Sequence, residues 1–263
     1  MIKSWGGRGV LQPNLSRYSL RGVKIMTSPM LTRRQWLVAM GAFGVGKALD
    51  VLAAEPLSRS VDREPNPPDA REALRRLKNG NQRFMNEKSR HTHETASWRS
   101  LLVQTQKPFA TVLGCSDSRV PPELIFDAGF GDLFMIRVAG NIIAEDVIGT
   151  LQYGVAHLHT PLVVVLGHEG CGAVGAAVEE MLHKTKELEH IESLIQLIKP
   201  GLRELDLSLE RAVLLRAAVE ANVRWSMRQL STSPEGARAL REKRVSLVGG
   251  VYELATGRVR FLD

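Results

Sequence analysis

Two cysteines and a histidine follow the ends of two short apolar runs. Val112-Leu113-Gly114 leads directly into Cys115, and Val165-Leu166-Gly167 leads into His168, with Cys171 three residues later. Thiolates and imidazoles are common zinc ligands, and three protein ligands are typical of catalytic zinc sites, which leave the fourth position open. The two thiols and the imidazole therefore predict a catalytic zinc site with one ion per chain.

Asp117 lies two positions after Cys115 and could fill or guard the fourth coordination position. Arg119 follows it, and a planar guanidinium suits a bidentate pairing that keeps a carboxylate ionised. Asp117 then has two possible states: paired with Arg119, or released to bind the zinc and close the site. Alternatively, Asp117 has no functional role and only forms a turn and a structural salt bridge with Arg119.

Cys115 and Cys171 are the only cysteines in the sequence, so a single disulfide is the main alternative to a metal. A chain of this length can bury a full apolar core and has little need of a single disulfide for its stability. A nucleophilic Cys–His pair is the other alternative for Cys115. A second cysteine close to the same histidine favours the metal.

The basic charge of the chain is confined to its first 34 residues, which contain seven Lys and Arg and no acid. Removing these seven from the 35 basic residues leaves 28, equal to the 28 Asp and Glu. The neutral remainder argues against a nucleic-acid partner.

The N-terminal segment has the parts of an export signal. Thr32-Arg33-Arg34-Gln35-Trp36-Leu37 resembles the twin-arginine motif, an apolar stretch follows to about Leu52, and Val51-Leu52-Ala53 suits cleavage. We expect a signal peptide over 1–53, a linker over 54–68, a catalytic domain over 69–263, and a periplasmic or otherwise exported product without a stable membrane partner. An uncleaved amphipathic anchor is the alternative.

The predicted site must be positioned by alternating strands and helices. Apolar runs predict strands at 109–113, 133–136 and 162–166, and a terminal hairpin at 245–262. Helical spacing predicts helices from an Asp69 cap to a stop at Gly80, and over 142–158, 172–181 and 209–230. We expect an α/β fold with a mostly parallel central sheet, flanking helices and a C-terminal antiparallel hairpin. His91 and His93 are expected to be exposed.

Three further motifs carry a family resemblance: Gly80-Asn81-x-Arg83-Phe84, Arg137-Val138-Ala139-Gly140-Asn141, and Gly167-His168-x-x-Cys171-Gly172. Together with Cys115-Ser116-Asp117-Ser118-Arg119, residues from about 69 to 263 resemble the β-class carbonic anhydrases. The resemblance implies that Cys115, His168 and Cys171 bind zinc and that Asp117 and Arg119 form the acid–base pair.

The same resemblance implies reversible hydration of carbon dioxide to bicarbonate and a proton. It further implies a homodimer, with N-terminal helices wrapped over the partner, or a tetramer. Some members have a regulatory bicarbonate pocket with tryptophan where this chain has Val112, which favours a constitutively open site here. The alternatives are a zinc hydrolase of carbonyl sulfide or carbon disulfide, and a non-enzymatic exported zinc-binding protein.

Overall fold

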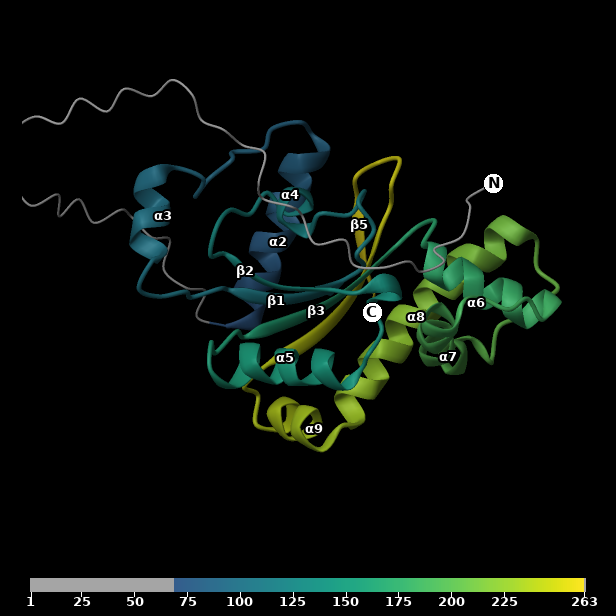
Figure 1. Cartoon of the computed structure of the whole chain (residues 1–263). Helices are drawn as coiled ribbons and strands as arrows, with labels where there is room; N and C mark the ends of the chain where they lie inside the picture. The colour runs from purple at the N-terminus through teal and green to yellow at the C-terminus, as the bar shows by residue number, and fades with distance from the viewer. Residues whose placement is uncertain (1–68, 263) are drawn as a thin grey trace, which may run out of the picture. The chain divides into compact units, whose positions relative to one another are not determined.

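The computed structural model describes residues 69–262, so the predicted signal peptide and linker lie outside the described residues. A five-stranded sheet in the order β2-β1-β3-β4-β5 forms the centre (Figure 1). Its strands are β1 (Ala110–Gly114), β2 (Leu133–Arg137), β3 (Leu162–His168), β4 (Ser246–Tyr252) and β5 (Val259–Leu262). The first four are parallel and β5 is antiparallel to β4, which confirms the predicted fold class and the terminal hairpin.

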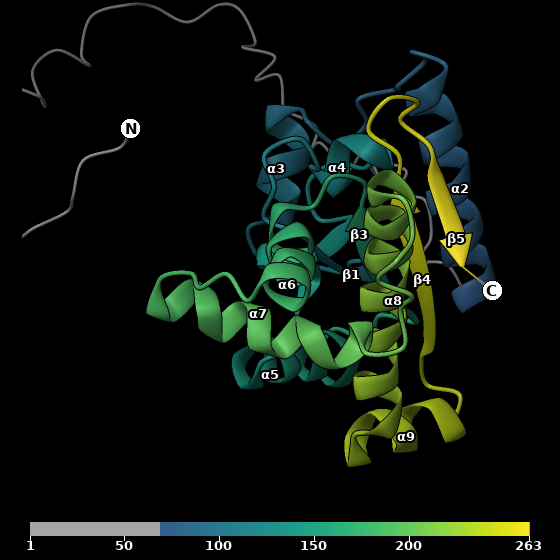
Figure 2. The ribbon, with the colours of Figure 1, turned by 90° about the vertical axis from the view of Figure 1, so that its right-hand side faces the viewer.

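Helices cover both faces of this sheet, as the two views in Figures 1 and 2 show. The long ones are α2 (Ala70–Met85), α5 (Glu145–Ala156), α6 (Gly172–His183), α7 (Glu189–Leu202) and α8 (Arg211–Thr232); the short ones are α3 (Ala96–Leu102), α4 (Pro122–Ile125), α9 (Pro234–Arg241) and the 3-10 turn η1 (Ala139–Asn141). Among the described residues, no helix is long and apolar enough to cross a membrane.

The core has two layers because alternate residues of each strand point to opposite faces. Val163 and Val165 of β3 pack with α5, α6, α7 and α8, while Leu162, Val164 and Leu166 pack with α2 and α4. Every residue of β1 and β3 is buried. This double burial explains why both strands are continuous apolar runs in the sequence.

Helix α2 begins as predicted but continues past its predicted stop. The Asp69 side chain accepts a 2.9 Å hydrogen bond from the amide of Glu72, which confirms the N-cap. Gly80 lies inside the helix rather than at its end. A Cβ at this position would be 1.8 Å from the carbonyl oxygen of Phe126, so no larger residue fits there. Close packing of α2 against a neighbouring backbone, rather than helix termination, therefore explains this glycine.

The segment after α2 contains a helix that the sequence did not suggest, α3, and a histidine whose predicted exposure is wrong. His93 is half-buried: its ring stacks on Trp98 at 3.9 Å between centroids, and its Nδ1 lies 2.9 Å from both carboxylate oxygens of Asp132. His91 is exposed as predicted.

Helices α5 and α6 confirm the helices predicted at 142–158 and 172–181. Helix α8 lies near its predicted range. Helical spacing within 209–230 predicts that Val213 faces inward, but this side chain is 41% exposed, and Leu214, Ala218, Val219 and Val223 form the buried stripe. Helices α7 and α9 were not predicted.

Candidate metal centre

The two predicted ligand-bearing strands are neighbours in the sheet. Strands β1 and β3 are parallel, with Gly114 opposite Leu166, so Cys115 and His168 both lie at the carboxyl edge. Cys171 occupies the N-cap position of α6, after a turn in which Gly170 has a φ of 64°. Ligands of open parallel sheets bind at this edge.

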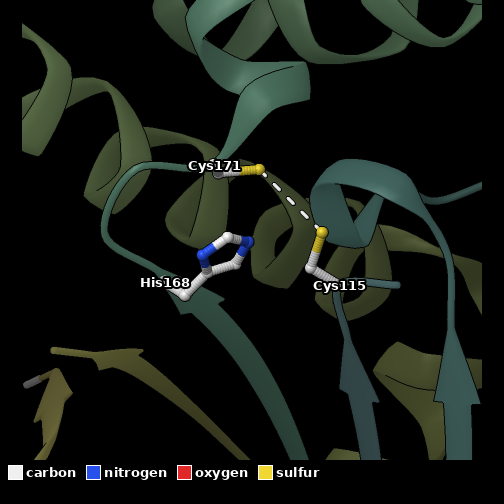
Figure 3. A group of neighbouring side chains, drawn as sticks. All are labelled: Cys115, His168 and Cys171. Atoms are coloured by element: carbon white, nitrogen blue, oxygen red, sulfur yellow. Dashed lines mark hydrogen bonds between the residues drawn. The ribbon is translucent and has the colours of Figure 1, made fainter. Parts of the chain in front are cut away.

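The structure brings the three predicted ligands together. One donor atom from each of Cys115, His168 and Cys171 lies within 4.8 Å of the others, and all three residues are buried. The two sulfurs are 4.0 Å apart and both cysteines are free, so they form no disulfide. Figure 3 shows the imidazole and the two sulfurs converging on one point.

The imidazole of His168 is oriented as a metal ligand requires. Its Nδ1 lies 2.8 Å from the carbonyl oxygen of Glu169. A carbonyl only accepts, so Nδ1 carries the proton and Nε2 keeps its lone pair. Nε2 is buried without a hydrogen-bond partner in the described structure. A buried polar atom without a partner is costly, and a cation held by the two sulfurs would remove that cost; the residues fit zinc.

The two sulfurs are close enough to perturb each other's pKa. The hydrogen bond between them lowers the pKa of Cys115, whereas the same bond and burial raise the pKa of Cys171. Metal binding to thiols displaces their protons, so a divalent cation at this site would bind thiolates.

Asp117 and Arg119 form a bidentate pair beside the three ligands. Arg119 Nε donates to Asp117 Oδ1 at 2.9 Å and Nη2 donates to Oδ2 at 2.7 Å. Asp117 Oδ2 also lies 3.9 Å from Nε2 of His168. Hydrogen bonds from Arg119 hold the pKa of the Asp117 carboxyl well below its usual range, so this group is ionised at neutral pH. Of the two states left open by the sequence, the structure has the paired one.

Arg137 also holds this loop; in the sequence it was noted only as part of a family motif, without a role. It lies at the end of β2 and donates to the carbonyl oxygens of Cys115, at 3.0 Å, and of Asp117, at 2.6 Å. An arginine at the carboxyl end of a neighbouring parallel strand is the signal that could have identified it.

Comparison with known proteins agrees with this geometry. Residues 110–259 match the family described as carbonic anhydrase. The chain is 35% identical to the carbonic anhydrase of Mycolicibacterium smegmatis over 190 residues, covering 71% of this chain and 90% of that protein. It is 40% identical to carbonic anhydrase 2 of Mycobacterium tuberculosis over 129 residues, or 49% of this chain. The alignment with carbonic anhydrase 2 spans 62% of the length of that protein.

Solved structures give the same result. The β-carbonic anhydrase CcaA superposes with a TM-score of 0.60 at 28% identity, covering 73% of this chain and 88% of that one. The β-carbonic anhydrase CafA of Aspergillus fumigatus has a TM-score of 0.59 at 27% identity, covering 73% and 90%. The chain belongs to the carbonic anhydrase family, in its β class.

Proposed function

We propose that this protein catalyses the reversible hydration of carbon dioxide to bicarbonate and a proton, with one zinc ion per chain. The observation that carries the proposal is the bidentate Asp117–Arg119 pair beside a Cys-His-Cys donor set. Zinc bound at such a set supplies a Lewis acid that makes water nucleophilic near neutral pH.

The residues of the chain then have separate roles. Cys115, His168 and Cys171 hold the metal, and Asp117 accepts a hydrogen bond from the attacking oxygen. Because Arg119 keeps the pKa of Asp117 low, the carboxylate acts as an acceptor and does not supply a proton at neutral pH. An acceptor aligned by two hydrogen bonds fixes the direction of the attacking lone pair towards the carbon.

The paired state of Asp117 supports an open site at rest. Val112, the position where a regulatory tryptophan occurs in some relatives, is completely buried among the apolar residues beneath α2. An apolar core residue at this position has no group that would bind bicarbonate. We therefore propose a constitutively open enzyme.

A stopped-flow hydration assay across pH on zinc-loaded protein tests the proposed reaction. We expect carbon dioxide turnover that rises above neutral pH, since two thiolates donate more charge to zinc than imidazoles do. Faster turnover of carbonyl sulfide or carbon disulfide than of carbon dioxide would assign the protein to the hydrolases on this fold.

Zinc analysis tests the ligand set separately. The wild-type protein should contain one zinc per chain, and Cys171→Ser should lose it, because the variant replaces a thiolate by a hydroxyl. Zinc binding without any hydration activity would favour the exported zinc-binding protein. Purified protein without metal, containing a Cys115–Cys171 disulfide, would contradict both readings.

The protein is also proposed to leave the cytoplasm by the twin-arginine route, on the strength of Arg33 and Arg34 and the apolar stretch after them. This route carries folded proteins, so the zinc would be loaded before export and both thiolates protected from oxidation. Replacing both arginines by lysine should retain the protein in the cytoplasmic fraction, and unchanged secretion would contradict the route.

A further inference from the structure

A polar pair on the long helix α8 lies inside the apolar core. Asn222 and Ser226 are one helical turn apart, with exposed fractions of 1% and 0%. Their neighbours on the buried stripe, Val219 and Val223, are apolar. Polar side chains in such a position are destabilising unless they are hydrogen-bonded, so their partners indicate their role.

Both side chains donate to the backbone of η1. Asn222 Nδ2 lies 2.8 Å from the carbonyl oxygen of Gly140, and Ser226 Oγ lies 3.0 Å from that of Asn141. Successive carbonyl groups of the turn are therefore fixed by successive turns of one helix.

The turn η1 has a backbone that needs this support. Gly140 and Asn141 have φ angles of 68° and 42°, so two consecutive residues are left-handed. Asparagine adopts this region less readily than glycine. A Cβ at position 140 would lie 2.8 Å from Cδ1 of Ile198 and 3.2 Å from Cβ of Ala173, so the segment is also tightly enclosed.

This conformation directs the amide of Gly140 at a metal ligand. Its nitrogen donates to Sγ of Cys115 at 3.4 Å. A hydrogen bond to a thiolate draws charge from the sulfur and fixes its direction. Partners of this kind, outside the ligand set, commonly tune metal affinity.

We infer that Asn222 and Ser226 are positioning residues which, through η1, hold the Gly140 amide on the Cys115 sulfur and so determine how tightly the centre retains its metal. The inference rests on the metal site of the proposed function but not on its reaction. It assigns the two buried polar residues of α8, Asn222 and Ser226, to the metal centre rather than to the packing of the helix.

Zinc retention by the loaded protein tests this assignment. In equilibrium competition with a chromogenic chelator, Asn222→Ala should bind zinc roughly 10–100-fold more weakly than wild type. Ser226→Ala should also weaken zinc binding, but by a smaller factor, because this substitution releases the carbonyl of Asn141 rather than that of Gly140. In cobalt-substituted protein, the sulfur-to-metal charge-transfer band should shift in both variants, since the Cys115 sulfur loses a fixed donor.

Asn81→Ala is the matched control, because Asn81 is also buried and bonds three backbone groups, at Ile125, Gly257 and Val259. It ties α2 to α4 and to the turn before β5, and none of these three bonds reaches Cys115, His168, Cys171 or η1. We expect it to lower the melting temperature while zinc affinity and the cobalt spectrum stay at wild-type values.

The inference is overturned if folded Asn222→Ala keeps wild-type zinc affinity and cobalt spectrum, or if Asn81→Ala changes them equally. Should Asn222→Ala not fold, Ser226→Ala decides by the same two readouts. Wild-type protein that holds zinc but hydrates no carbon dioxide would contradict the proposed function alone. Wild-type protein that binds no zinc overturns both.

Discussion

Asp117 receives three hydrogen bonds from a single residue: Arg119 donates through its backbone nitrogen, Nε and Nη2. Arg119 Nη2 also donates to the carbonyl oxygen of Gly170, in the turn between His168 and Cys171. The guanidinium thus links the acceptor to the loop that carries two of the ligands. A carboxylate held in this way keeps one orientation relative to the metal centre.

Asp117→Asn should lower carbon dioxide hydration by about 10²–10⁴-fold, the usual range for a positioned acid–base group. The amide can present only one oxygen to Arg119, and its NH₂ group would face the guanidinium. Stopped-flow rates on zinc-loaded variant measure the loss. Asp206→Asn is the matched control, because Asp206 bonds Ser208 in a surface turn. Near-normal rates for Asp117→Asn would refute its assigned role.

At the scale of the elements, two glycines show how differently helices pack in this fold. Gly80 in α2 lies against the backbone of Phe126, whereas nothing lies within 4 Å of a Cβ built at Gly149 in α5. Both are inside helices, so the intrinsic preference for alanine is the same at each.

Gly80→Ala should therefore destabilise the protein by about 1–3 kcal/mol, the usual cost of overpacking. Gly149→Ala should stabilise it by about 0.5–1 kcal/mol, because alanine favours the helix and meets no neighbour. Chemical denaturation with equal m-values measures both. Equal effects of the two substitutions would show that contact with Phe126 does not determine the need for glycine in α2.

An ion pair ties α8 to the last strand and gives a pH-dependent prediction. Hydrogen bonds from Arg260 and then Arg224 lower the pKa of Glu220. A lowered folded-state pKa means that the pair stabilises the fold above the unfolded value of about 4.3 and that this contribution is lost as pH falls through the folded value.

Glu220→Gln should lower the melting temperature at pH 7 by a small amount, since partly exposed pairs contribute about 1 kcal/mol or less. The difference from wild type should shrink as the pH falls below about 4, where the wild-type carboxylate is also neutralised. Thermal melts in matched buffers measure it. A difference that persists in acid would indicate lost packing rather than lost charge.

How far the sequence predicts these elements depends on how strongly each is buried. The strands β1 and β3 are buried on both faces, so their residues are almost all apolar and their ends, with Cys115 and His168, could be located. Helix α9 has a local start signal that was overlooked, the Ser233 cap followed by Pro234 at the first helical position. The contact of His93 with Asp132, in contrast, depends on tertiary neighbours. No local pattern encodes such neighbours, and Gly80 was misread for the same reason.

The three candidate metal ligands could be predicted from the sequence, whereas the groups that position them could not. Cys115, His168 and Cys171 are of unusual type and spacing, and they converge because parallel strands share a carboxyl edge. Arg137 and Asn222 are ordinary residue types, and they lie 22 and 107 positions after Cys115. Only the fold shows that one bonds the ligand loop and the other bonds the turn next to Cys115.

At the scale of the whole molecule, one edge of the sheet offers a surface for association. Within the described residues β2 is an edge strand, and Phe130 just before it is 54% exposed. Tyr153 of α5 is 47% exposed and its ring contacts that of Phe134 in β2, with centroids 6.0 Å apart. Exposed strand edges and apolar side chains are typical of association surfaces. We therefore propose that a homodimer forms through the β2 edge.

Tyr153→Glu should convert the dimer into monomers at micromolar concentration, because it places an unpaired charge in an apolar interface. Light scattering after size-exclusion chromatography gives the mass directly. Leu188→Glu is the matched control: Leu188 is 75% exposed at the start of α7, apart from the β2 edge, and its substitution should leave the dimer intact. A dimer that survives Tyr153→Glu but dissociates in Leu188→Glu would place the interface on the α6–α7 side of the molecule instead.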